Sequence, residues 1–347
     1  MVLLMKISLK TLCVTIGLLS TALGVLSWPI TAYTTQARIA HWVESNGGRV
    51  TWRHDSIFEV PIVTIVDMNF AKVTSIEILG DAVYLEHLNL SGTKVKSLKP
   101  ISGLRRLQSL RADGAPIMKL DSTHLWLPAI ESLGLSNTSL TELAGVEECR
   151  NLKYLNLSGT KIQSFAFSRQ HRFPRLSELE ISDSPVKNLD GLNDCPNLEY
   201  VDISNTRVSD ISAIGNCRKL EHLRMSSTAV IDFSPILKLD RLVLLKANNT
   251  NFSDGKLLKH LKLLDWIELS GTGLTDVSWI SGRQNMLYLD ISFTKVNNTD
   301  PLKSIHAASL NLQGLSLSRE EQLELQAAAP DTDFDFGQEP LENGPRD

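Results

Sequence analysis

Apolar residues recur along most of the chain in a fixed triplet, in which two apolar positions flank one variable position. The first triplet is Val66-Asp67-Met68, and the last begins at Leu310 and ends at Leu312. The triplet occurs twelve times, and eight of the eleven spacings are 22 residues, with the others between 21 and 24. An alternating triplet is typical of a short strand with one buried face. The constant period predicts a repeat protein whose units bury their apolar faces only by stacking.

A second landmark follows each triplet at a fixed distance. Five residues after the first apolar position, nine units carry a hydroxyl side chain: Thr93, Thr138, Thr160, Ser184, Thr206, Thr228, Thr250, Thr272 and Thr294. The other three units carry Ala71, Ala115 and Leu315 at this position. The β-branch of threonine suits an extended backbone. We therefore expect a column of hydroxyl groups at the turn after each strand.

The two landmarks together resemble the leucine-rich repeat family, as in the run from Leu155 to Ile162, which is L-N-L-S-G-T-K-I. The family frame is LxxLxLxxNxL with a period of 20–29 residues, and here threonine replaces the asparagine. The resemblance implies an α/β solenoid, an arc or horseshoe with a parallel sheet on its concave face and short helical turns on its convex face. In the family the asparagine bonds to the backbone of neighbouring turns, so the threonine hydroxyls are expected to do part of this work. The 22-residue period is similar to that of the internalin-like bacterial subclass, and the whole chain resembles its membrane-anchored members.

The ends of the repeat array carry different patterns. Ile39, Trp42 and Val43 have helical spacing, and a short alternating stretch begins at Arg49. After the last unit, Arg319 to Ala329 has a helical pattern, and a solenoid needs polar caps at both ends. The predicted segments are 1–33 (signal anchor or transmembrane segment), 34–65 (amino-terminal cap), 66–317 (repeats), 318–336 (carboxy-terminal cap) and 337–347 (disordered acidic tail).

The amino-terminal segment predicts export. Residues 11–33 contain no charged side chain, and Lys6 and Lys10 precede them. About 20 apolar residues span a bilayer as a helix, and basic residues before the span place the amino terminus in the cytoplasm. We expect a single-pass anchor with extracytoplasmic repeats. A cleaved signal peptide, which would give a secreted or periplasmic protein, and a buried helix are the alternatives.

Charge and composition exclude several function classes. The net charge is -4, but the last 17 residues hold six acids and one arginine, so the remaining chain carries about +1. A near-neutral body offers no electrostatic footprint for nucleic acid. No nucleophile–base arrangement, phosphate loop or zinc-ligand spacing has a signature here. We therefore expect no enzyme, no cofactor and no metal.

The cysteines occupy a repeated apolar slot. Cys149, Cys195 and Cys217 each lie six residues before the next triplet, where other units have Leu239 or Leu261. Free cysteine is a good small core residue, so a core role is the main interpretation. Cys195 and Cys217 belong to adjacent units and could instead form a disulfide in an oxidising compartment.

The concave sheet face is the predicted binding surface. Two outward columns follow from the frame, one just before each apolar pair and one between its members. The residues proposed to bind a ligand are Tyr154, Asn156, Glu180, Tyr200, Asp202, His222, Arg224, Lys246, Trp266, Glu268, Tyr288 and Asp290. Tyrosine, tryptophan and arginine are enriched at binding hot spots. An alternative is that strands favour aromatic residues and that charges keep the face soluble.

These features predict a non-enzymatic interaction scaffold, membrane-anchored and extracytoplasmic, that binds a protein or peptide ligand. A cytoplasmic regulatory subunit of another enzyme is one alternative, and it requires that residues 11–33 are not exported. A carbohydrate or cell-wall binding module is the other, because aromatic faces also stack on sugars. The identity of the ligand does not follow from the sequence.

Overall fold

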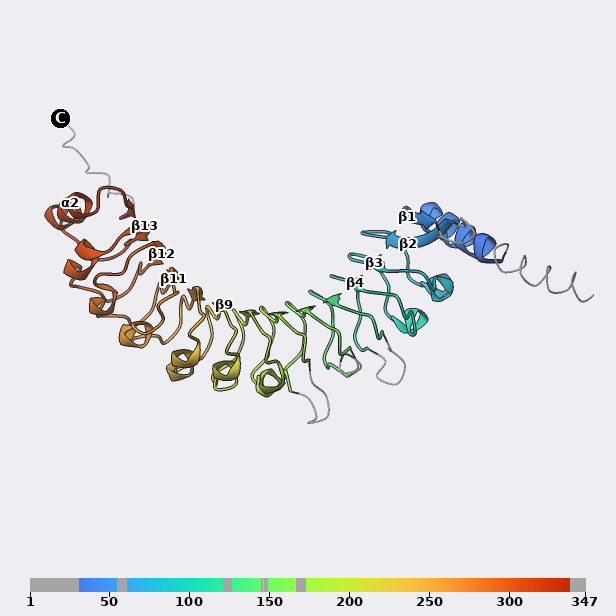
Figure 1. Ribbon diagram of the computed structural model, residues 1–347, viewed down its shortest axis with the longest axis horizontal. Coiled ribbons are helices and arrows are strands. Elements are labelled where there is room, and N and C mark those ends of the chain that lie inside the picture. Colours follow the sequence, from blue (N-terminus) through green and yellow to red (C-terminus); the bar gives the residue numbers. More distant parts are fainter. Residues whose placement is uncertain are drawn as a thin grey trace, which may run out of the picture.

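The computed structural model describes residues 31–54, 61–120, 127–144, 146, 149–166 and 173–337. Fourteen strands in this part of the chain form one sheet, and their order in the sheet is their order in the sequence. The chain forms an open arc in which the strands line the concave side and the short helices lie on the convex side (Figure 1). The predicted arc with a concave sheet is therefore confirmed.

The sheet begins with one antiparallel pair and continues with parallel pairs. Strand β1 (Arg49–His54) pairs antiparallel with β2 (Pro61–Asp67), and each later strand pairs in parallel with the one before it. The later strands are β3 His87–Asn89, β4 Ser109–Arg111, β5 Ser132–Gly134, β6 Tyr154–Asn156, β7 Glu178–Glu180, β8 Tyr200–Asp202, β9 His222–Arg224, β10 Leu244–Lys246, β11 Trp266–Glu268, β12 Met286–Asp290, β13 Ala307–Asn311 and β14 Asp333–Asp335.

The core is a lattice of the two inward positions of each triplet. Leu155 and Leu157 are fully buried, and the register places Leu155 between Leu133 and Leu179 of the adjacent units. Because neighbouring strands lie ~4.8 Å apart, the inward side chains of successive units touch and exclude water. A single unit has no such neighbour, which is why the fold requires the whole stack.

The hydroxyl column closes turns within each unit. The Thr160 hydroxyl donates to the Leu157 carbonyl at 2.7 Å, and the equivalent bond occurs in all nine units that carry a hydroxyl. The family resemblance implied bonds between neighbouring turns. Here the backbone provides those links instead, as where the Leu157 amide donates to the Glu180 carbonyl at 2.7 Å. The difference follows from the short reach of threonine, whose hydroxyl meets a carbonyl of its own turn first.

Short 3₁₀ helices form the convex side of the arc. Aspartates precede several of them, and Asp210, Asp232 and Asp276 each accept a backbone N–H from two residues further on, at 2.7–2.8 Å. The backbone N–H of the following serine lowers the pKa of Asp232 and of Asp276. The described 3₁₀ helices are η1 Glu77–Asp81, η2 Lys99–Ile101, η4 Asp190–Asp194, η5 Ile214–Asn216, η6 Ser234–Lys238, η7 Gly255–Leu258, η8 Ser278–Ile280 and η9 Asp300–Ser304.

Different elements cover the two ends of the core. Residues 31–45 are helical, and the side chain of Gln36 accepts the Val63 backbone N–H at 2.9 Å. At the other end, the predicted helix is present as α2 (Arg319–Ala328), with Ser318 as its cap. Strand β14 then pairs with β13, so the sheet continues one strand beyond the twelve predicted units.

Parts of the predicted anchor and tail lie outside the described residues. These are 1–30 of the proposed signal anchor and 338–347 of the proposed disordered tail. Within the described ranges, no helix combines the length and the apolar composition needed to cross a membrane.

The two cysteines of adjacent units lie in the core. Cys195 and Cys217 are buried, and the structure has both as free thiols. The Cys195 thiol faces the Gly191 carbonyl, with its sulfur 3.4 Å from the oxygen. Burial raises the pKa of both thiols, that of Cys217 to about 12. The structure thus places them in the apolar slot that the repeat frame predicts, without a disulfide between them.

Candidate binding face

All twelve predicted residues lie on one face of the sheet, on strands β6 to β12. Their strands are in register, so Tyr200 lies beside His222, and Asp202 lies beside Arg224. The same register continues to β12, where Trp266 lies beside Tyr288. Because strand side chains alternate between faces, the residues that flank each buried position share the concave face. The structure therefore assembles the two outward columns as predicted.

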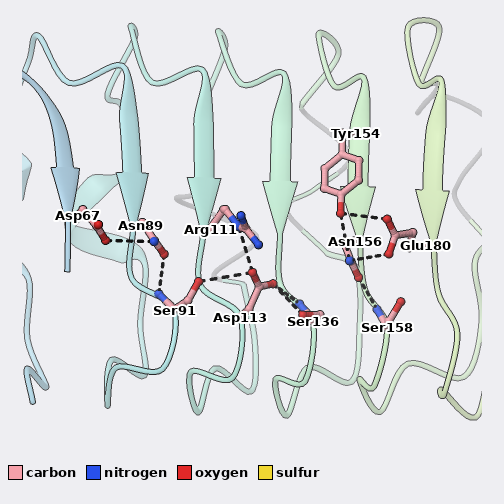
Figure 2. Close-up of polar contacts among 10 residues, drawn as sticks. All are labelled: Asp67, Asn89, Ser91, Arg111, Asp113, Ser136, Tyr154, Asn156, Ser158 and Glu180. Carbon is pink, nitrogen blue, oxygen red and sulfur yellow. Dashed lines mark hydrogen bonds and ion pairs between the residues drawn. The ribbon is translucent and has the colours of Figure 1, made fainter. Parts of the chain in front are cut away.

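The first contact group joins three of these residues around Glu180 (Figure 2). The Tyr154 hydroxyl donates to the Glu180 carboxylate at 3.1 Å, and the Asn156 amide donates to the other carboxylate oxygen at 2.9 Å. The Asn156 side-chain oxygen accepts the Ser158 backbone N–H at 2.9 Å. Burial raises the pKa of Tyr154, and the nearby Glu180 charge raises it further. The phenol is therefore a neutral hydrogen-bond donor near pH 7.

The second contact group surrounds Tyr200. The His222 ring meets the Tyr200 ring edge-on, with centroids 6.0 Å apart, and the Arg224 guanidinium carbon lies 5.4 Å from the Tyr200 centroid. Burial raises the pKa of Tyr200 to about 12, although the Arg224 charge acts in the opposite direction. Asp202 accepts the Ser204 backbone N–H at 2.9 Å. The aromatic ring thus has a cation against it and stays neutral near pH 7.

The third contact group is centred on Glu268. Its carboxylate pairs with the Lys246 ammonium at 2.6 Å and accepts from the Trp266 indole at 2.7 Å and from Asn248 at 3.0 Å. The same ammonium lies 5.6 Å from the Trp266 ring centroid. Burial by itself raises the pKa of Glu268, but these donors outweigh it, so the pKa is lowered overall. Glu268 is therefore ionised at neutral pH and fixes the rings beside it.

The end of the face carries a fourth group. The Tyr288 ring lies 4.9 Å from the Trp266 ring, measured between centroids, with a tilt of 41°. Asp290 is buried, and it accepts the Ser292 backbone N–H at 2.9 Å and the Ser292 hydroxyl at 2.6 Å. This aspartate therefore has a structural partner and little surface to offer a ligand.

Known protein families match the repeats of the chain. The model described as "Leucine Rich repeats (2 copies)" matches residues 174–216, and the model described as "Leucine Rich repeat" matches residues 148–164. Together with the single sheet whose strands follow the order of the sequence, these matches show the fold of a leucine-rich-repeat solenoid. No curated protein matches its sequence significantly.

Solved structures share the fold of the solenoid at low sequence identity. An internalin from Listeria monocytogenes is 18% identical over 87% of this chain and 94% of its own, with a TM-score of 0.66. A leucine-rich-repeat protein from Leptospira interrogans is 17% identical over 77% of this chain and 82% of its own, with a TM-score of 0.65. The ectodomain of an Arabidopsis thaliana membrane receptor kinase, solved with CASPARIAN STRIP INTEGRITY FACTOR 2, is 15% identical over 76% of this chain and 40% of its own, with a TM-score of 0.52.

A polar ladder that the repeat pattern did not predict lies on the part of the concave face nearer the amino terminus (Figure 2). The Asn89 amide donates to Asp67 at 3.1 Å, and Asn89 accepts the Ser91 backbone N–H at 3.0 Å. Further along, Asp113 accepts from the Ser136 hydroxyl and amide, both at 2.9 Å. The sequence contains a pattern that indicates this ladder: serine directly follows the second apolar position in several units, as at Ser91 and Ser136.

The structure also gives a role to Arg283, which occupies the apolar slot of its unit. Its guanidinium donates to the Leu264 carbonyl at 2.8 Å and to the Leu261 carbonyl at 3.2 Å. Burial lowers its pKa. Arginine therefore replaces a core leucine here by bonding to the carbonyls of the preceding unit of the solenoid.

The described part of the solenoid contains no group of three or more His, Cys, Asp or Glu side chains that could hold a metal ion. The arrangement on the concave face places charged groups against aromatic rings, as Arg224 lies against Tyr200 and Glu268 accepts from Trp266.

Proposed function

We propose that this protein is a non-enzymatic interaction scaffold that binds a protein or peptide ligand on its concave sheet face. The observation that supports this most directly is the aromatic column formed by Tyr154, Tyr200, Trp266 and Tyr288, each ring held by a charged or aromatic neighbour. Large rings are frequent at binding hot spots. Rings that are already fixed lose little entropy when a ligand binds, which favours affinity.

The length of the face suits an extended peptide. Strands β6 to β12 are seven neighbours in the sheet. At ~4.8 Å per strand, their six spacings span about 29 Å. An extended chain covers about 3.3 Å per residue, so about nine residues would follow the column from end to end. The receptor ectodomain with the same fold was solved with a named factor, which supports a ligand-binding role for this solenoid.

The contacts favour a peptide over a sugar as the ligand. Sugars stack on open aromatic faces, whereas cations lie against Tyr200 and Trp266 here, 5.4 Å and 5.6 Å from the ring centroids. A peptide can instead use ring edges, hydroxyls and charges at the same time. We therefore place the carbohydrate-binding alternative second.

The location of the protein is part of the proposal. Residues 1–33 would anchor it in the membrane, with the amino terminus in the cytoplasm and the repeats outside, as in membrane-anchored bacterial members of the internalin-like 22-residue subclass. The uninterrupted uncharged run from 11 to 33 supports this. Membrane fractionation with protease added to intact cells tests it. Protection of the repeats from the protease would contradict an extracytoplasmic location.

Crosslinking and pull-down from membranes with the full-length protein tests the binding face. We expect the double variant Tyr200→Ala with Trp266→Ala to lose the captured partner. Tyr84→Ala is the matched control, because Tyr84 is a half-buried tyrosine in the loop between η1 and β3, outside the two concave columns. If the double variant captures the same partner as the wild type, the concave-face assignment is wrong.

A further inference from the structure

Arg224 differs from the other charged residues of its column. All five of the others have polar partners in the structure: Glu180, Asp202, Glu268 and Asp290 accept hydrogen bonds, and Lys246 pairs with Glu268. The Arg224 side chain makes no hydrogen bond and no ion pair with any described residue, and its Nε is buried without a partner. Its guanidinium carbon lies over the Tyr200 ring, 5.4 Å from the centroid.

An unpaired guanidinium in this position is unusual. A buried donor without an acceptor destabilises a fold, so proteins satisfy nearly all of them. Asp202 lies beside Arg224 in the register but forms no ion pair with it within 4 Å. The Tyr200 ring lies against the guanidinium, whose carbon is 5.4 Å from the ring centroid, and the buried Nε–H donor has no acceptor. A donor without an acceptor is expected at a binding site, where the ligand supplies the missing acceptor.

We propose that Arg224 binds a side-chain carboxylate of the peptide that lies on the concave face, an inference that rests on the proposed function. The planar guanidinium offers two parallel N–H donors that match the two oxygens of a carboxylate. The Tyr200 ring would hold the guanidinium plane in place for this contact. Since β9 is the middle strand of the aromatic face, the pair would fix the register of the ligand along the column.

The surrounding charges favour a carboxylate over a phosphate. Asp202 on one side adds a negative charge, and Lys246 on the other side is neutralised by Glu268 at 2.6 Å. A phosphate monoester carries close to two negative charges near pH 7 and meets more repulsion from Asp202 than a single carboxylate does. The site therefore suits an aspartate or glutamate side chain.

Selection of binders from a phage-displayed library of random short peptides, on the immobilised full-length protein, tests this inference. We expect the selected peptides to share an acidic residue, and Arg224→Gln to weaken their binding by about tenfold or more, since an arginine that pairs with a carboxylate in a partly buried site contributes at least this much. Changing the shared acid to its amide should weaken binding to the wild type but add little to the effect of Arg224→Gln. Arg241→Gln, at an exposed arginine in the loop before β10, is the matched control and should leave affinity unchanged.

The possible failures are distinguishable. Peptides that lose binding with Trp266→Ala but keep it with Arg224→Gln would overturn the carboxylate site and leave the proposed function in place. Peptides that require a phosphorylated residue instead of an acidic one would also overturn it. A selection without binders, or with binders insensitive to both variants, would overturn the proposed function and this inference together. Circular dichroism should show that Arg224→Gln keeps the fold, because Arg224 holds no polar partner in it.

Discussion

The concave face consists of two regions with one backbone and different surfaces. On strands β2 to β5 the outward positions include Ser109, Ser132 and Gly134, which carry small side chains or none, and polar groups bond to one another, as Asn89 does to Asp67. On strands β6 to β12 the same positions carry the large rings and the charges that hold them. We call these the polar region and the aromatic region.

The comparison separates what the fold requires from what it permits. Both regions have the same parallel register and the same buried triplets, for example Leu88 and Leu90 in the first and Leu155 and Leu157 in the second. Small polar side chains are therefore sufficient for stacking, and the rings are not needed to build the sheet. Exposed rings lower solubility, and the polar region forms the same sheet without them, which is the physical reason to assign the rings a role in binding.

The largest expected effect is the same in both regions. Leu90→Asp in the polar region and Leu157→Asp in the aromatic region each bury an unpaired carboxylate where the leucine is fully buried. We expect either variant to lose about 4 kcal/mol or more of unfolding free energy, measured by urea titration with circular dichroism. Lys94→Asp and Lys161→Asp, at exposed positions of the same units, are the controls. If Leu90→Asp lowers the unfolding free energy much less than Leu157→Asp does, the core behind the polar region is not packed like the core behind the aromatic region.

A smaller effect should distinguish the two regions. Trp266→Ala removes a ring from the aromatic region, and Arg111→Ala removes an exposed side chain from the polar region. We expect Trp266→Ala to weaken binding of a captured ligand by about 2 kcal/mol, as at other hot spots, and Arg111→Ala to leave it unchanged. Isothermal titration calorimetry with that ligand measures both. If the two variants weaken binding equally, the ligand contacts both regions, and the two regions do not differ in binding.

The sequence predicts the architecture in both regions because the buried pattern is periodic. The first two residues of each predicted triplet lie on an observed strand, and each hydroxyl of the column makes the same bond in its turn. Strand β14 was predicted only as part of the carboxy-terminal cap, although Phe334-Asp335-Phe336 keeps the flanked pattern and begins 24 residues after Leu310. Its pairing with β13 becomes visible only once the stack supplies a free sheet edge.

The contacts between side chains on the concave face were much less predictable from the sequence than the positions of those side chains. Opposite charges in adjacent strands suggest that Arg224 pairs with Asp202, yet Arg224 lies against Tyr200 and Asp202 bonds to the backbone. Each side chain in a parallel sheet has a neighbour on both sides at about the same spacing, so small differences in rotamer energy decide which one it contacts. The sequence pattern does not contain those differences.

The turns at the sheet edge allow a prediction within the polar region. Gly92 and Gly114 both have left-handed backbones, with φ of +67° and +70°. A Cβ at Gly92 would lie 2.3 Å from the Phe70 ring, whereas a Cβ at Gly114 would meet nothing within 4 Å. We expect Gly114→Ala to cost about 1 kcal/mol from backbone strain alone, and Gly92→Ala to cost more because the ring must move. Thermal unfolding measures the difference, and equal costs would mean that Phe70 moves away freely.

The smallest effects concern two carboxylates of the aromatic region. Hydrogen bonds from Lys246, Trp266 and Asn248 lower the pKa of Glu268 against the opposing effect of burial, whereas burial raises the pKa of Asp265. A lowered pKa adds stability that is present above the unfolded pKa and is lost as the pH falls through the folded one. A raised pKa adds stability that is present below the unfolded pKa and is lost as the pH rises through the folded one.

The two carboxylates should therefore respond oppositely to removal of their charge at pH 7. Glu268→Gln should lower the unfolding free energy by about 1 kcal/mol, because it weakens donors that need an ionised acceptor. Asp265→Asn should keep or raise it, because one Asp265 oxygen is buried without a hydrogen bond and its charge is poorly solvated. As the pH falls through the carboxylate range, the deficit of Glu268→Gln should shrink, since the wild-type carboxylate is protonated there as well. Urea titrations at several pH values measure both trends. If Glu268→Gln still lowers the unfolding free energy at acid pH, the shape of the Glu268 side chain, and not its charge, holds Trp266 in place.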